Sequence, residues 1–91
     1  MKKSMLDILA CPIDKHYPLE LFEAVSEGQI VKEGALFCSK CSRYYPIIDE
    51  IPVMLPDELR KKDRERDLTF LRKWQGKLPD KVIKQGNPWH L

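Results

Sequence analysis

The residues of this sequence best suited to chemistry are its three cysteines, Cys11, Cys38 and Cys41. Two residues separate Cys38 from Cys41, a spacing that lets a tight turn present both sulfurs to one metal ion while backbone N–H groups relieve their charge. Cys11 is followed by Pro12 and has the form of the first half of a second such turn. Twenty-six residues lie between Cys11 and Cys38, enough for a β-hairpin between the two turns. This arrangement predicts a zinc ribbon.

The fourth ligand of this predicted zinc site is not a cysteine. At the spacing of the second turn, the partner of Cys11 would be Asp14, and His16 follows two positions later. Both residue types bind zinc, and imidazole accompanies thiolates in structural sites more often than carboxylate does. The sequence leaves both open, and a metal-free pair of turns with cysteines packed as small apolar residues is an alternative. Redox use of Cys38 and Cys41 lacks the βαβ pattern that usually surrounds it.

Size and composition limit what the chain can be. Its 91 residues are 43% hydrophobic and 33% charged, which indicates one small folded domain that needs a metal or a partner for stability. The longest apolar runs, of four or five residues, are too short to cross a membrane, and Asp7 interrupts the N-terminus before a signal peptide develops. An odd number of cysteines without a secretory signal favours reduced thiols and a cytoplasmic location.

No catalytic set can be assembled from the sequence. The only histidines are His16, a candidate ligand, and His90 near the C-terminus, and the four glycines are isolated, so no phosphate-binding loop is present. A metal site closed by four protein ligands has no open position for a substrate. The chain is therefore predicted not to be an enzyme.

Local patterns predict an antiparallel sheet that brings the cysteines together. Ser4 and Asp7 indicate a short helix over residues 5–9, and partial alternation of apolar and acidic residues indicates a strand over 19–25. Further predicted elements are a turn at 26–28, two short strands at 30–31 and 36–37, a turn at 49–50 and a last strand at 51–55. The predicted class is a small α+β domain with a zinc-ribbon-like antiparallel sheet and a short N-terminal helix.

The composition and charge of the chain change at Pro56. Residues 1–55 carry 6 basic and 8 acidic side chains, whereas residues 56–91 carry 10 basic and 6 acidic ones. A helix is predicted over 57–74 and a further helical turn over 80–85. We therefore predict a zinc-ribbon-like domain over 1–56 and a basic helical extension and tail over 57–91.

The stretch EGALFCSKCSRYYPIIDEIPVML, residues 33–55, closely resembles the signature of one family. That family is the small activator subunit shared by several S-adenosylmethionine-dependent methyltransferases of archaea and eukaryotes, which also has short bacterial relatives. Residues 5–12 resemble the family's N-terminal segment, and residues 18–21 its next strand. The resemblance covers about residues 4–56. It departs from the family pattern at Asp14, where many relatives have cysteine, and the extension beyond Pro56 lies outside the shared signature.

The resemblance implies a function that spacing alone does not. Members of this family form heterodimers with methyltransferases that modify tRNA, ribosomal RNA or translation termination factors. The partner binds the methyl donor and does the chemistry, and the small subunit covers an apolar surface of the enzyme and supports cofactor binding, largely through strand pairing. The implied role of this chain is a non-catalytic, cytoplasmic subunit that binds, solubilises and activates such methyltransferases.

An edge strand over 51–55, in which Pro52 limits self-pairing, could accept an added strand of a partner. Apolar residues near it and in the N-terminal segment would supply the centre of the interface, although the same residues could equally form the core of this domain. The predicted partner-binding residues are Met5, Leu6, Leu9, Ile48, Pro52, Val53, Met54 and Leu55.

Two other functions compete with activation of a methyltransferase. One is an autonomous nucleic-acid-binding zinc ribbon, in which basic residues contact phosphates while Phe70 and Trp74 stack on bases. Interleaved acids weaken that interpretation, and a softer version has the extension helping a partner enzyme to hold RNA. The basic residues of this nucleic-acid hypothesis are Arg60, Lys61, Lys62, Arg64, Arg66, Arg72 and Lys73. The second competing function is that of a freestanding structural protein.

Overall fold

The structure is a computed structural model that describes residues 1–17, 19–87 and 89–91. Its centre is a four-stranded antiparallel sheet with strand order β1-β2-β3-β4. The strands are β1 (Glu20–Glu27), β2 (Ile30–Phe37), β3 (Tyr44–Ile48) and β4 (Ile51–Pro52). The sheet and the surrounding helices confirm the predicted α+β fold class. Pro18, which the resemblance places at the start of a strand, lies outside the described residues.

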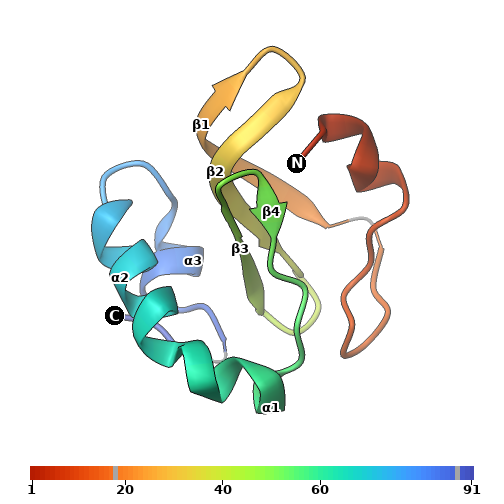
Figure 1. The fold of residues 1–91 in the computed structure, drawn as a ribbon. Helices are drawn as coiled ribbons and strands as arrows, with labels where there is room; N and C mark the ends of the chain where they lie inside the picture. The colour runs from red at the N-terminus through yellow and green to blue at the C-terminus, as the bar shows by residue number, and fades with distance from the viewer. Residues whose placement is uncertain (18, 88) are drawn as a thin grey trace.

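Short helices lie on opposite sides of this sheet, as Figure 1 shows. The N-terminal segment is on one side, and the C-terminal helices are on the other. The N-terminal helix is the 3₁₀ helix η1 (Lys3–Asp7), and the C-terminal helices are α1 (Asp57–Arg60), the 3₁₀ helix η2 (Lys61–Asp63), α2 (Arg64–Lys73) and α3 (Asp80–Ile83). Within the described residues, no helix has the length and apolar character needed to span a membrane.

Alternation along the strands gives the sheet two apolar faces. Successive side chains of a strand point to opposite sides, so Tyr44 and Tyr45 contribute to different cores. The buried residues of the first core, on the side of η1, are Met1, Cys11, Leu19, Val31, Leu36, Cys38, Tyr45 and Ile47. Those of the second core, on the side of α2 and α3, are Ala35, Phe37, Tyr44, Phe70, Leu71, Leu78, Val82 and Ile83.

Several sequence-based boundaries need correction. The two short strands predicted around Gly34 are one strand, β2, because glycine lets β1 approach: a Cβ at Gly34 would lie 2.4 Å from the carbonyl oxygen of Phe22. The predicted strand 51–55 ends at Pro52. The N–H of Val53 still donates to the oxygen of Pro46, but Pro46 has no N–H to return, so the ladder stops there.

The predicted helices are also shorter or broken. The helix expected over 57–74 is divided by η2, because its middle offers no apolar face and instead turns two charged residues, Arg60 and Asp67, inward. The N-terminal helix expected over 5–9 is the 3₁₀ helix η1, in which no side chain caps the first turn. Residues of α2 and α3 form half of the second core, and a domain boundary at residue 56 stays a prediction.

Candidate functional site

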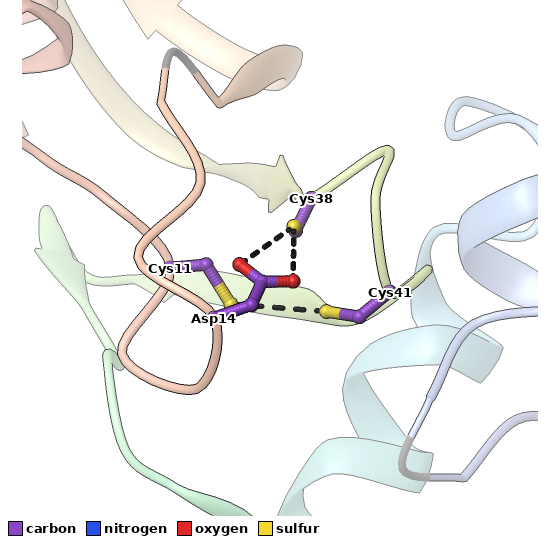
Figure 2. Close-up of side chains that lie close together, drawn as sticks. All are labelled: Cys11, Asp14, Cys38 and Cys41. Atoms are coloured by element: carbon purple, nitrogen blue, oxygen red, sulfur yellow. Dashed lines mark hydrogen bonds between the residues drawn. The ribbon is translucent and has the colours of Figure 1, made fainter.

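Four side chains form a compact cluster at one end of the sheet. One ligand atom from each of Cys11, Asp14, Cys38 and Cys41 lies within 4.8 Å of all the others. Cys11 and Asp14 come from the loop that follows η1, and Cys38 and Cys41 come from the turn between β2 and β3 (Figure 2). The three cysteines are free thiols. The structure thus brings together all three predicted cysteine ligands and one of the two candidates for the fourth.

The two turns that carry these side chains have the same backbone geometry. In the first, the N–H of Lys15 donates to the oxygen of Cys11 and the N–H of Cys11 donates to the oxygen of His16. In the second, Ser42 donates to Cys38 and Cys38 donates to the oxygen of Arg43. Lys15 and Ser42 also share a positive φ, 62° and 61°. The match places Asp14 where the second turn has Cys41.

The distances within the cluster fit a zinc ion. In a tetrahedral zinc site, two sulfurs lie about 3.8 Å apart, and a sulfur lies about 3.5 Å from a carboxylate oxygen. The sulfurs of Cys11 and Cys41 are 3.8 Å apart, and the sulfur of Cys38 is 3.5 and 3.6 Å from the two oxygens of Asp14. Two edges of such a tetrahedron, Cys11–Cys41 and Cys38–Asp14, thus have the expected length, and the other pairs of ligand atoms lie within 4.8 Å of each other. The donor set is therefore compatible with the metal that the sequence predicts.

Hydrogen bonds and burial shift the pKa values of the cluster in opposite directions. The backbone N–H of His16, 2.9 Å from Asp14 Oδ1, is the main reason why the pKa of Asp14 is lowered to about 2. Burial raises the pKa of the Cys38 thiol to about 12, although the backbone N–H groups of Cys41 and Lys40 act in the opposite direction. The hydroxyl of Tyr45 lies 3.0 Å from Cys11 Sγ. Burial, and then the contact with Cys11, raises the pKa of Tyr45. The hydroxyl therefore stays protonated and can donate a hydrogen bond to a Cys11 thiolate.

His16 lies outside the group of four. Its Nε2 atom is 3.4 Å from the hydroxyl of Ser39, and its contribution to the cluster is the backbone N–H that orients Asp14. The sequence could not separate His16 from Asp14, because either side chain can reach a metal bound by Cys11. In the structure, the backbone turns at Lys15, which has a positive φ, so Asp14 lies inside the turn beside Cys11 and His16 lies after it.

Predicted partner-binding residues gather mainly on the side of the first core. Met5, Leu6, Leu9 and Met54 pack against this core and are only partly buried. The two segments that carry them are joined, since the backbone nitrogen of Met1 donates to the carbonyl oxygens of Val31 and Glu50 beside β4. Pro52, Val53 and Leu55 are also half-buried. We call the surface formed by residues 5–9 and 52–55 the open face. Ile51 is not part of it, because Ile51 pairs with Ile48 and so shares the opposite side of the sheet.

Three isoleucines differ from the predicted set of partner-binding residues. Ile8 and Ile51, with exposed fractions of 78% and 65%, are the most exposed large apolar residues described, yet neither was among the predicted interface residues. Ile8 follows the end of η1 at Asp7, and no signal in the sequence separates it from its half-buried neighbours Leu6 and Leu9. Ile48 lies on the opposite side of the sheet, where it lines a cavity of about 170 Å³ beside Phe70.

The basic extension is less suited to nucleic acid than its sequence indicates. Arg60 is fully buried, and Phe70 is 4% exposed, so neither can contact a phosphate or stack on a base. Lys73 is paired with Glu33, and Arg66 with Asp63. The basic side chains of the predicted set for which no ion pair is found among the described residues are Lys61, Lys62, Arg64 and Arg72.

Comparisons with known proteins agree with the geometry. A family model described as Trm112p-like protein matches residues 2–50. A UPF0434 protein of Nitrosococcus oceani is 37% identical over 70 residues, which cover 75% of this chain and all of that protein. A UPF0434 protein of Rhodopseudomonas palustris strain BisB18 is 46% identical over 59 residues, 65% of this chain and 76% of that protein.

A solved structure is also similar. It is the complex between the Haloferax volcanii Trm112 methyltransferase activator and a candidate methyltransferase. A chain of that complex superposes with a TM-score of 0.63 and 42% sequence identity, over 66% of this chain and the whole of the other. A quarter or more of this chain therefore has no counterpart in the N. oceani protein or in the solved structure, and the family model leaves residues 51–91 unmatched.

Proposed function

This chain belongs to the Trm112p-like family, and we propose from that membership that it is a subunit that binds and activates S-adenosylmethionine-dependent methyltransferases. The observation that carries the proposal is the 42% identity to a chain solved in complex with a candidate methyltransferase. The activator has no catalytic role of its own, and the enzyme binds the methyl donor. The resemblance points to tRNA, ribosomal RNA or termination factors as the substrates of the complex, in the cytoplasm.

The open face is the surface that the enzyme would cover. Ile8 is exposed, and Met5 and Met54 are only partly buried against the first core. Burying such apolar side chains at the centre of an interface is favourable. β4 is a short edge strand whose ladder ends at Pro52, so an added strand from the enzyme could pair beyond it. The opposite side of the sheet is already covered by α2 and α3.

Zinc is the metal proposed for the cluster, with Cys11, Cys38, Cys41 and Asp14 as its ligands. Three thiols and one carboxylate within 4.8 Å of one another, with two of their separations at tetrahedral values, support this choice. The ion would join the loop after η1 to the turn between β2 and β3. It would thereby hold the N-terminal part of the open face in place against the sheet. Its role is structural, because four protein ligands leave no position for a substrate.

Affinity capture tests the partner. The tagged chain is purified from its own cell lysate, and copurifying proteins are identified by mass spectrometry. Near-stoichiometric recovery of one or more methyltransferases is expected. Met54→Glu and Ile8→Glu should each reduce that recovery by about tenfold or more, because a charge replaces an apolar side chain at the interface.

Leu59→Glu is the matched control, because Leu59 is an exposed apolar residue (55%) on α1, outside the open face. It should leave recovery unchanged. Capture of RNA alone, or of no partner at all, would reject the proposed function. Recovery that all three variants leave unchanged would keep the function but reject the open face as its interface.

A further inference from the structure

The two metal-binding turns share a backbone geometry but are supported from different parts of the chain. The first turn is supported from within, since the N–H of His16 holds the carboxylate of Asp14. The second turn is supported by residues more than forty positions away, at the end of the C-terminal segment. This segment lies beyond the residues that the family model matches.

Asn87 is the residue that contacts the second turn. Its side-chain nitrogen donates to the carbonyl oxygen of Cys41 at 2.9 Å, and its N–H donates to the oxygen of Ser42 at 2.8 Å. Its own carbonyl oxygen accepts from the N–H of Tyr44, which completes a parallel bridge with Arg43. Three hydrogen bonds from one residue thus fix the backbone on the C-terminal side of the Cys41 thiol.

Arg43 forms the second link between this turn and the C-terminal segment. Its guanidinium makes a bidentate ion pair with Asp57 of α1, with Nε 3.0 Å from Oδ1 and Nη2 2.8 Å from Oδ2. Arg43 also belongs to the turn itself, because its carbonyl oxygen accepts from the N–H of Cys38. The ion pair with Asp57 therefore holds the residue that closes the turn.

Buried contacts hold the C-terminal segment where Asn87 can make these bonds. The indole N–H of Trp89 donates to Asp67 at 3.1 Å, and Arg60, fully buried, donates to the same carboxylate and to the oxygen of Tyr44. Gly86 packs so closely on Tyr44 that a Cβ there would lie 2.6 Å from the ring. The position of Asn87 is therefore set by the second core.

We propose that residues 57–91 are part of the metal site although none of them is a ligand: Asn87 positions the turn that carries Cys41, and Asp57 holds Arg43, whose carbonyl oxygen closes that turn. The inference rests on the proposed zinc binding. It gives the C-terminal segment a role that shorter relatives must fulfil in another way or do without. Zinc affinity and docking of the C-terminal segment are then coupled, each strengthening the other.

Competition with a chromophoric zinc chelator, carried out on the full chain, measures the effect. Asn87→Ala and Asp57→Asn should each weaken zinc binding by about 10-fold to 100-fold, the usual cost of removing a group that orients a ligand. Lys81→Ala is the matched control: it removes another contact between this segment and the sheet, the 2.7 Å ion pair with Glu20, away from the metal. Its zinc affinity should equal that of the unaltered chain.

Hydrogen exchange provides a second measurement that does not depend on a variant being well folded. Adding zinc to the unaltered chain should slow exchange of the amides of Tyr44 and Asn87, which join the turn to the C-terminal segment. If the unaltered chain binds zinc but both variants bind it equally tightly, or these amides do not respond, the inference is wrong and the proposed function is unaffected. If the unaltered chain binds no zinc, both the zinc proposal and this inference fail.

Discussion

The two faces of the sheet are covered in different ways. α2 and α3 cover the face that carries Phe37 and Tyr44, and we call this side the closed face. Among the described residues, the face that carries Leu36 and Tyr45 packs instead against η1, the loop after it and the irregular segment after β4. Its core residues are as well buried as those of the closed face, but Ile8 above them remains 78% exposed. The chain thus covers one face with helices of its C-terminal segment, and it leaves on the other the apolar surface that we propose for a partner.

The largest expected effect is at the ion pair of the closed face. Arg60 and Asp67 are both fully buried, with Arg60 Nη2 2.9 Å from Asp67 Oδ2. Asp67→Ala leaves the guanidinium buried without its partner and should lower the free energy of unfolding by about 3–5 kcal/mol. Denaturant unfolding measures this change. Replacing both residues, as in Arg60→Met with Asp67→Leu, should recover most of the loss, and a double variant as unstable as the single one would contradict this account.

Gly86 tests how tightly the C-terminal segment closes that same face. A Cβ at this position would lie 2.6 Å from both the Tyr44 ring and the backbone oxygen of Val82. Gly86→Ala should therefore cost about 1–3 kcal/mol of stability through overpacking. Gly76→Ala is the control, because nothing lies within 4 Å of a Cβ there. Equal stability of the two variants, measured by thermal unfolding, would mean that the segment packs more loosely than the structure shows.

How much the sequence predicts differs between the two faces. Cysteine spacing and a specific motif predict that Cys11, Cys38 and Cys41 cluster, as the structure shows, because such a cluster depends on short local turns. Only the competing nucleic-acid hypothesis counts Arg60 among the phosphate contacts, and the structure buries it. The sequence does not predict this burial, because it depends on Asp67, Tyr44 and the distant Trp89. Asn87 gave no signal at all, since its partner in the chain is 46 residues away. Local geometry can be derived from sequence, whereas contacts that close a face across the whole chain cannot.

The pH dependence of zinc affinity tests the proposed metal site, on the side of the sheet opposite to α2 and α3. Burial raises the pKa of the Cys38 thiol to about 12, so in the metal-free chain this thiol is protonated throughout the physiological range. Zinc binding must release at least that proton, and affinity should fall by about tenfold or more for each pH unit of acidification, about 1.4 kcal/mol. Chelator competition between pH 8 and pH 6 measures the slope. An affinity independent of pH in this range would show that the cluster is not assembled from protonated thiols.

The smallest expected effect lies at the margin of the closed face. Lys81 on α3 forms an ion pair with Glu20 on β1, with Nζ 2.7 Å from Oε2, and lies over the rings of Phe22 and Phe37. Both charged side chains are 43% exposed, so solvent screens the pair and Lys81→Ala should cost only about 1 kcal/mol or less. Zinc affinity and partner capture should not change. A loss as large as that of Asp67→Ala would mean that the surface pair, rather than the buried residues beneath it, holds the C-terminal segment to the sheet.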